Sequence, residues 1–222
     1  MGAGAFWDRE TFVRAASGAA FVALLLSAAA FGPWPLLALW LVIGLGSFVE
    51  WRRHAGAGSP PAAQMLRLFL FLGLAGVMVS LPWSAGGDYD PKHVWLFLVL
   101  VWTNDTLAYV FGRLFGRHKL MPAVSPGKTW EGFVGGVFAA ALVGGLWQSQ
   151  TGFASDGAFV GGVTGVLATA GDLTQSAWKR KRGLKDSGQI MPGHGGFLDR
   201  FDGFLYALPV YGLIAWVLGA FF

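Results

Sequence analysis

The chain has 222 residues, of which 55% are hydrophobic and only 13% charged, and its mean hydropathy is +0.54. A soluble domain usually carries about twice that charged fraction, so the composition indicates a membrane protein and argues against a soluble one. The absence of cysteine excludes disulfides, zinc–thiolate sites and thiol nucleophiles. The net charge of +4 is not gathered into a basic patch on a soluble module, so we expect no nucleic-acid partner.

Seven segments are apolar enough to be predicted as membrane-spanning helices, each of which needs roughly 20 residues. They lie near residues 15–31, 34–49, 66–83, 94–112, 132–149, 157–176 and 204–222. Arg9 and Arg14 precede the first apolar run, a pattern that cleaved signal peptides share. Because a second apolar segment follows at once, we favour a retained anchor. The predicted fold class is all-α, a polytopic integral membrane protein.

The basic residues give the predicted orientation. With seven spans and an inner amino terminus, 15 of the 16 Lys and Arg lie inside, and only Lys92 lies outside. The positive-inside rule then predicts a cytoplasmic amino terminus and an outer carboxyl terminus. Glycines recur in the fifth and sixth predicted spans, where they would let helices pack closely. These are Gly132, Gly135, Gly136, Gly144, Gly145, Gly161, Gly162 and Gly165.

Acidic residues gather at the predicted inner side. Asp105 lies within the fourth predicted span, where a carboxylate is costly unless it is paired, for example with Arg113, or bound to a metal. Asp172 lies near the inner end of the sixth span, and Asp199 and Asp202 precede the last, at a spacing that shares one helix face. Mg²⁺ takes oxygen ligands, typically one or two carboxylates together with substrate phosphates. The pattern predicts a metal-dependent site.

Basic residues and glycines lie between these acids. The cluster Lys179–Arg182, followed by Lys185, is by itself typical of a stop-transfer signal or of contact with anionic lipids. Here it continues into a glycine-rich turn whose backbone N–H groups are suited to phosphate oxygens. That combination favours a nucleoside triphosphate or a pyrophosphate as ligand. His194 in this turn is a candidate acid/base or an orienting residue, whereas His54, His93 and His118 have no partner pattern and are expected to be incidental.

One phosphate-binding motif is incomplete. Gly127-Lys128-Thr129 reads like the end of a P-loop, but Pro122 stands where that motif needs glycine, and no strand is expected before it. We interpret residues 125–132 as an inner loop that opens the fifth helix, with Lys128 in reach of a phosphate.

Several of these segments together resemble the signature of the phosphatidate cytidylyltransferase (CDP-diacylglycerol synthase) family. The resemblance is near-continuous from about residue 95 to 205, with Glu50-Trp-Arg52 as a fainter upstream match. The segments that carry it are Asp105–Gly112, Gly116–Lys119, Ser125–Gly132, Ser176–Arg180, Lys185–Gly188 and Pro192–Asp202.

The resemblance implies transfer of CMP from CTP to phosphatidic acid, with Mg²⁺ as cofactor. On this basis we expect Asp172 and Asp199 to be the metal ligands. The expected catalytic residues are Asp105, Asp172, Asp199, Asp202, Lys185 and His194. The expected substrate-binding residues are Ser125, Lys128, Ser176, Lys179, Arg180, Gly193, Gly195, Gly196 and Arg200.

The expected organisation and surroundings follow from composition, charge pattern and the resemblance together. We expect an N-terminal two-helix segment over 1–54, a linker over 55–65 and a catalytic transmembrane domain over 66–222. Expected partners are CTP, phosphatidic acid or a related lipid phosphate, membrane lipids and a second copy in a homodimer. The expected location is the bacterial inner membrane, with the site facing the cytoplasm. The alternatives are a CTP-dependent lipid kinase of the polyprenol type, an ion-coupled transporter and a scaffold without activity.

Overall fold

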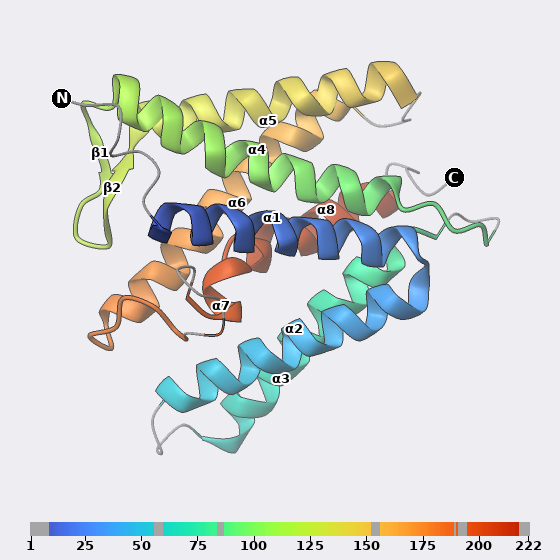
Figure 1. The fold of residues 1–222 in the computed structure, drawn as a ribbon, viewed down its shortest axis with the longest axis horizontal. Coiled ribbons are helices and arrows are strands. Elements are labelled where there is room, and N and C mark those ends of the chain that lie inside the picture. Colours follow the sequence, from blue (N-terminus) through green and yellow to red (C-terminus); the bar gives the residue numbers. More distant parts are fainter. Residues whose placement is uncertain are drawn as a thin grey trace.

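The computed structural model describes residues 9–55, 60–83, 87–151, 156–188, 190 and 195–217. Within them, seven long helices correspond one to one with the seven predicted spans, and successive helices alternate in direction (Figure 1). The long helices are α1 Arg9–Ala30, α2 Pro33–His54, α3 Pro61–Ser80, α4 Lys92–Phe115, α5 Trp130–Thr151, α6 Gly157–Arg180 and α8 Phe204–Val217. The short elements are β1 Lys119–Met121, β2 Ser125–Thr129 and α7 Phe197–Arg200.

Four helices of the described chain are long and apolar enough to cross a membrane, at residues 33–54, 62–80, 92–115 and 130–150. Residues 17–30 and 204–217 form shorter apolar helices. The chain is therefore an integral membrane protein built almost wholly of helices, as its composition predicts. α3 begins at Pro61, inside the predicted linker, and residues 56–59 of that linker lie outside the described part.

The segment between α4 and α5 differs from its prediction. It was expected to be a loop with no strand, but it forms an antiparallel hairpin in which Lys119 pairs with Thr129 and Met121 with Ser125. The loop prediction is wrong because nothing in Ser125–Thr129 alternates between polar and apolar residues. The pairing of the two strands and the contacts of the hairpin with α6 stabilise it instead.

Glycine lets α4, α5 and α6 approach one another closely, as predicted. A Cβ atom at Gly144 of α5 would collide with the carbonyl oxygen of Gly157, and one at Gly161 of α6 would collide with that of Ala140. A Cβ atom at Gly136 would lie 2.6 Å from the carbonyl oxygen of Asn104 on α4. Small residues permit this kind of packing between helices in a bilayer, so these three helices form a close-packed unit.

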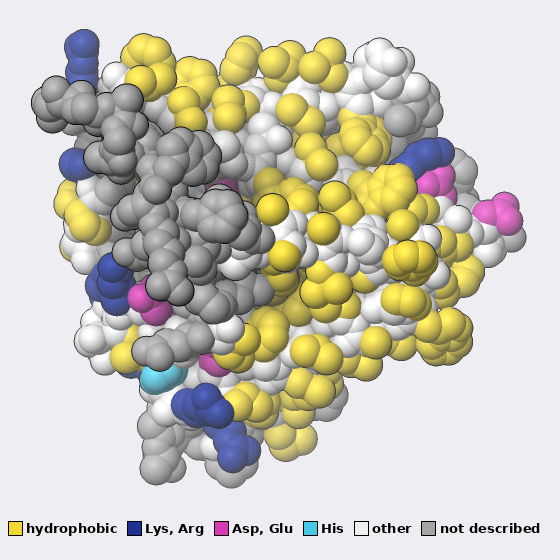
Figure 2. Space-filling model, viewed as in Figure 1, with side chains coloured by type: hydrophobic (Ala, Val, Ile, Leu, Met, Phe, Trp, Pro, Cys, Tyr) yellow, Lys and Arg dark blue, Asp and Glu magenta, His cyan; other side chains and the backbone are white. Residues whose placement is uncertain are grey.

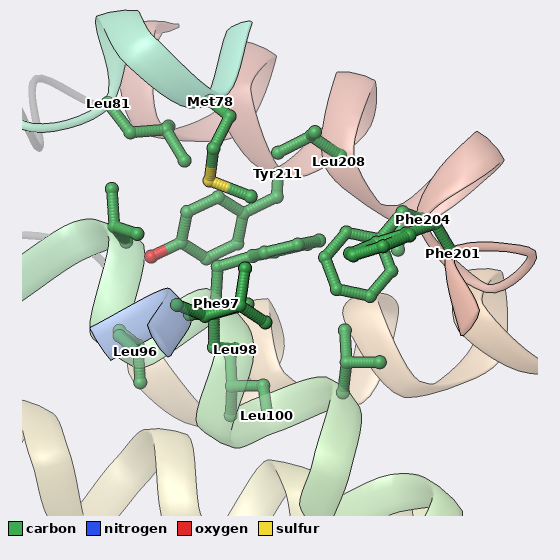
Figure 3. Close-up of a cluster of buried hydrophobic side chains, with 14 of the residues drawn as sticks. Met78, Leu81, Leu96, Phe97, Leu98, Leu100, Phe201, Phe204, Leu208 and Tyr211 are labelled. Carbon is green, nitrogen blue, oxygen red and sulfur yellow. The ribbon is translucent and has the colours of Figure 1, made fainter. Parts of the chain in front are cut away.

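An aromatic cluster joins α4 to α8 (Figure 3). The ring of Phe97 lies 5.1 Å from that of Phe204 and 5.1 Å from that of Tyr211. The buried hydroxyl of Tyr211 donates to the carbonyl oxygen of His93 at 3.1 Å. Edge-to-face and tilted contacts at such distances are favourable between aromatic rings. The cluster fixes the start of α8 against α4, and with it the acidic segment that precedes α8.

Charge is concentrated at the ends of the helices. Figure 2 shows a hydrophobic band across the face in view, with most Lys and Arg at one end. The hairpin lies at that end, whereas α4 begins at the opposite end (Figure 1). There Lys92 pairs with Asp90 at 2.8 Å. This distribution agrees with the charge pattern of the sequence, and the orientation across the membrane stays a prediction.

Candidate active site

An open cavity of about 540 Å³ lies at the charged end, between α4, the hairpin, α5, α6 and the α7 segment. Eight predicted site residues line it, although they come from positions 105 to 202. They are Asp105, Ser125, Lys128, Asp172, Lys179, Asp199, Arg200 and Asp202. The fold therefore brings the predicted acids and several of the predicted cations to one place.

Three carboxylates, which we call the front acids, face this cavity with few donors: Asp105, Asp172 and Asp202. Asp172 Oδ2 pairs with Lys128 Nζ at 2.5 Å, and its Oδ1 accepts from Ser176 Oγ at 3.1 Å.

The other two front acids accept still fewer hydrogen bonds. Asp105 Oδ1 accepts from Asn104 Nδ2 at 3.2 Å. Asp202 Oδ1 accepts from the N–H of Gly203 at 2.8 Å. Burial, and after it the nearby Asp172 carboxylate, raises the pKa of Asp202 well above its ordinary value. Like charges around one cavity favour the binding of a cation.

Asp199 lines the cavity as well, but it is only 7% exposed. Lys179 Nζ donates to its Oδ1 at 2.7 Å. Its Oδ2 accepts from the N–H and the hydroxyl of Ser187, at 2.7 and 2.9 Å, and from the N–H of Gly196 at 3.0 Å. Burial acts to raise the pKa of Asp199, but these bonds outweigh it and leave the pKa below its ordinary value. A carboxylate offers about four acceptor sites, so Asp199 is saturated.

The donor set suits Mg²⁺ at the front acids. Within the described chain, no group of three or more His, Cys, Asp or Glu side chains is arranged to hold a metal on its own. Mg²⁺ in nucleotide enzymes usually takes one or two carboxylates and completes its shell with phosphates and water. Asp172 and Asp202 fit that requirement, whereas Asp199 would have to lose Lys179 first.

The remaining predicted site residues that the structure describes do not line the cavity, and their positions differ. Ser176 orients Asp172, as described above. Arg180 Nε donates to the carbonyl oxygen of Val124 at 3.3 Å, so Arg180 holds the turn of the hairpin. Lys185 is exposed and does not line the cavity. Gly195 has a positive φ of 81°, and Gly193 and His194 lie outside the described residues.

Glu50 is a residue that the sequence analysis did not place in the site. It lies on α2, is 2% exposed, and accepts from the N–H groups of Phe197 and Leu198 at 3.0 and 2.9 Å. Its Oε2 also accepts from Ser187 Oγ at 3.2 Å. An acid at the end of an apolar helix is a costly choice, and that cost was the available signal.

Two histidines expected to be incidental have partners. His54 Nε2 lies 2.9 Å from the carbonyl oxygen of Ser187, to which it donates. His118 Nδ1 lies 2.7 Å from Glu131 Oε1. These partners are distant in the sequence and become neighbours only in the fold, so no sequence pattern indicated them.

Tyr109 and Arg113 also line the cavity, at its α4 side. Arg113 Nη1 donates to Tyr109 Oη at 3.1 Å. Tyr109 follows Asp105 by four positions, so the two share one face of α4. Leu114, which follows Arg113 in the chain, is 68% exposed.

Comparisons with known proteins agree with this geometry. A family model described as "Cytidylyltransferase family" matches residues 59–218. A phosphatidate cytidylyltransferase of Staphylococcus aureus (strain COL) is 45% identical over 119 residues, which cover 52% of this chain and 46% of that protein. One of Staphylococcus haemolyticus (strain JCSC1435) is 41% identical over 150 residues, which cover 66% and 58%. The chain thus spans about half the length of the curated relatives that it matches.

Proposed function

The chain belongs to the cytidylyltransferase family, and from this premise we propose that it is a phosphatidate cytidylyltransferase. The observation that carries the proposal is the single cavity that gathers the front acids with Lys128, Lys179 and Arg200. Relatives that share 41–45% identity with it bear that name. The proposed reaction converts CTP and phosphatidic acid to CDP-diacylglycerol and pyrophosphate.

The proposed reaction needs cations more than it needs a base. A phosphate oxygen of the lipid forms a bond to the α-phosphorus of CTP, and the bond from that phosphorus to the β-phosphate bridging oxygen breaks. The lipid phosphate is already anionic at neutral pH, so no strong base has to remove a proton. The barrier lies in bringing two polyanions together and in the charge of the leaving pyrophosphate. Positively charged groups fixed in a cavity reduce both costs.

We propose that Asp172 and Asp202 hold Mg²⁺, with Asp105 as a further oxygen donor. When bound, Mg²⁺ would neutralise the triphosphate and the leaving pyrophosphate. Asp199 was the predicted second ligand, but its saturated carboxylate favours Asp202 in that role. Ser176, which donates to Asp172, keeps that side chain turned to the cavity.

Lys128 is the proposed cation for the triphosphate. It extends from β2 and pairs with Asp172 at 2.5 Å, and both side chains are about 30% exposed. When a triphosphate enters, Lys128 can donate to a phosphate oxygen and release the Asp172 carboxylate. Arg180 supports this arrangement because it fixes the hairpin turn.

The lipid phosphate is proposed to enter along α4. Arg113 and Tyr109 stand at that side of the cavity, next to the exposed side chain of Leu114. A guanidinium binds phosphate oxygens well, and an apolar neighbour suits acyl chains. With the predicted topology, the cavity would open to the cytoplasm and to the inner leaflet of a bacterial inner membrane. A homodimer stays a prediction from the glycine-rich helices.

The proposal is tested by following the phosphates of CTP. The purified chain is incubated with Mg²⁺, phosphatidic acid and CTP labelled at either the α- or the γ-phosphate. We expect α-label in the lipid product and γ-label only in pyrophosphate. Transfer of γ-label to the lipid would identify a lipid kinase and contradict the proposal, as would no transfer from either position.

A further inference from the structure

The C-terminal end of α2 contacts residues that lie in the chain between Asp186 and Asp199, two residues that line the cavity. We use the name signature loop for the described residues at the two ends of this stretch, which are Ser187 and Gly188 at one end and Gly195–Leu198 at the other. The Glu50 carboxylate binds both ends of this loop, because it accepts from Ser187 Oγ and from the N–H groups of Phe197 and Leu198. Ser187 donates to Asp199 as well. Two carboxylates, Glu50 and Asp199, therefore both bind Ser187 and the residues around Gly196.

Two glycines of the loop leave space for the Glu50 side chain. Gly196 has φ −97° and ψ −178°, an extended conformation that any residue can adopt. The backbone conformation at this position therefore does not require glycine. A Cβ atom at Gly196 would, however, collide with both carboxylate oxygens of Glu50, and one at Gly188 would collide with Oε1. Glycine at these positions leaves room for the carboxylate.

Further contacts lie on the same face of α2. Gly46, Glu50 and His54 follow one another at intervals of four residues, so they form one stripe along the helix. A Cβ atom at Gly46 would collide with the ring of Phe197. His54 Nε2 donates to the carbonyl oxygen of Ser187. One helix face thus contacts both the beginning and the end of the signature loop.

This contact adjoins the site residues along the chain. Glu50 binds the first N–H groups of α7, and α7 carries Asp199 and Arg200 and leads directly to Asp202. Displacement of α7 would move Arg200, an expected substrate-binding residue, and the adjoining Asp202, a proposed metal ligand. A misplacement of about 1 Å costs on the order of 100-fold in rate when groups must be held in reacting geometry.

We propose that Glu50 is a positioning residue of the active site, and that α2 is a required part of that site in addition to being a membrane helix. α2 precedes residues 59–218, over which the family model matches. The measurement of turnover rests on the proposed function. The structural basis of the role of Glu50, which is its set of hydrogen bonds to the loop, is independent of that function.

The first test compares Glu50→Gln and Glu50→Asp in the full chain. For each variant, kcat and KM for CTP are measured per folded molecule, with the folded fraction taken from gel filtration and thermal unfolding. We expect Glu50→Gln to lower kcat by about 10- to 100-fold and to change KM less. Glu50→Asp, which keeps the charge, should recover part of the loss. The control is Asp90→Asn, an acid that pairs with Lys92 at the opposite end of α4. A kcat per folded Glu50→Gln molecule equal to that of the wild type would overturn the proposal.

The second test is a double-mutant cycle between Glu50→Ala and Gly196→Ala. If Gly196 is needed to make room for Glu50, Gly196→Ala should lower kcat strongly alone and little in the Glu50→Ala background. Equal losses in both backgrounds would overturn the proposal. So would a cycle that couples in melting temperature but not in turnover, since Glu50 would then be structural only. If the wild type transfers no CMP, the proposed function fails, while the melting-temperature cycle still reports the contact itself.

Discussion

The acids at the charged end of this protein fall into two groups that differ in burial and in the number of hydrogen bonds that they accept. The front acids, Asp105, Asp172 and Asp202, line the cavity, and each accepts only one or two of the hydrogen bonds and ion pairs described above. The back acids, Glu50 and Asp199, are buried and accept three and four. A carboxylate near a bilayer is costly unless it is compensated.

The difference between the groups indicates their roles. The protein itself compensates the back acids, with backbone N–H groups, Ser187 and Lys179, so they stabilise a loop. The front acids keep oxygen atoms available, which supports the proposal that a bound cation compensates them. The resemblance to known sequences pairs Asp172 with Asp199 as expected metal ligands, whereas their hydrogen bonds place these two acids in different groups.

The largest effect is expected from removing a front acid. Asp202→Asn should lower CMP transfer by at least about 100-fold, because it removes charge that holds a metal needed in the transition state. Thermal unfolding in detergent should change little, since Asp202 accepts only from its own neighbour Gly203. Near-wild-type turnover of a folded Asp202→Asn protein, assayed with α-labelled CTP, would remove Asp202 from the metal site.

Removing the partner of a back acid should affect stability first. Lys179→Met breaks the buried pair with Asp199, in which the side chains are 9% and 3% exposed. Loss of one partner of a buried pair costs roughly 3–5 kcal/mol. Thermal or denaturant unfolding of the purified protein measures this loss. An unchanged midpoint would show that the pair does not hold the loop.

A smaller effect is expected at the hairpin. Lys128→Met should raise KM for CTP by about tenfold, since a charge-assisted hydrogen bond is worth about 1.5–3 kcal/mol. Its effect on unfolding should be small because the pair with Asp172 is partly exposed. Steady-state kinetics at varied CTP checks this, and a KM equal to that of the wild type would show that Lys128 does not bind the triphosphate.

The smallest effect is a change in acid stability. The pKa of Asp199 in the folded protein is lowered, so the carboxylate stabilises the fold at pH values above the unfolded pKa of about 3.9. This contribution is lost as the pH falls through the lower folded pKa. Unfolding midpoints followed through this acidic range should therefore fall for the wild type and change less for Asp199→Asn. Parallel curves for the two proteins would contradict the assigned role of the carboxylate.

Hydropathy predicted the seven helices because a bilayer demands long apolar segments. It did not predict the β1–β2 hairpin, whose strands are short, polar and stabilised by contacts with α6. The front acids were predictable as site residues because a charged side chain in or beside an apolar segment is costly unless it is paired or binds a ligand. The role of Glu50 was not, because its partner Ser187 is 137 positions away and only the packing of α2 brings the two together. The same holds for the saturation of Asp199, which depends on where the fold places Lys179, Ser187 and Gly196.

The most direct test of this division is the binding of a divalent cation in the presence of CTP. Mn²⁺ can replace Mg²⁺ as a paramagnetic probe, and the free ion is quantified by electron paramagnetic resonance for the wild type, Asp202→Asn and Asp199→Asn. The account predicts that Asp202→Asn weakens Mn²⁺ binding by at least about tenfold, or 1.4 kcal/mol, and that Asp199→Asn weakens it less. Loss of Mn²⁺ binding in folded Asp199→Asn, with unchanged binding in Asp202→Asn, would contradict it.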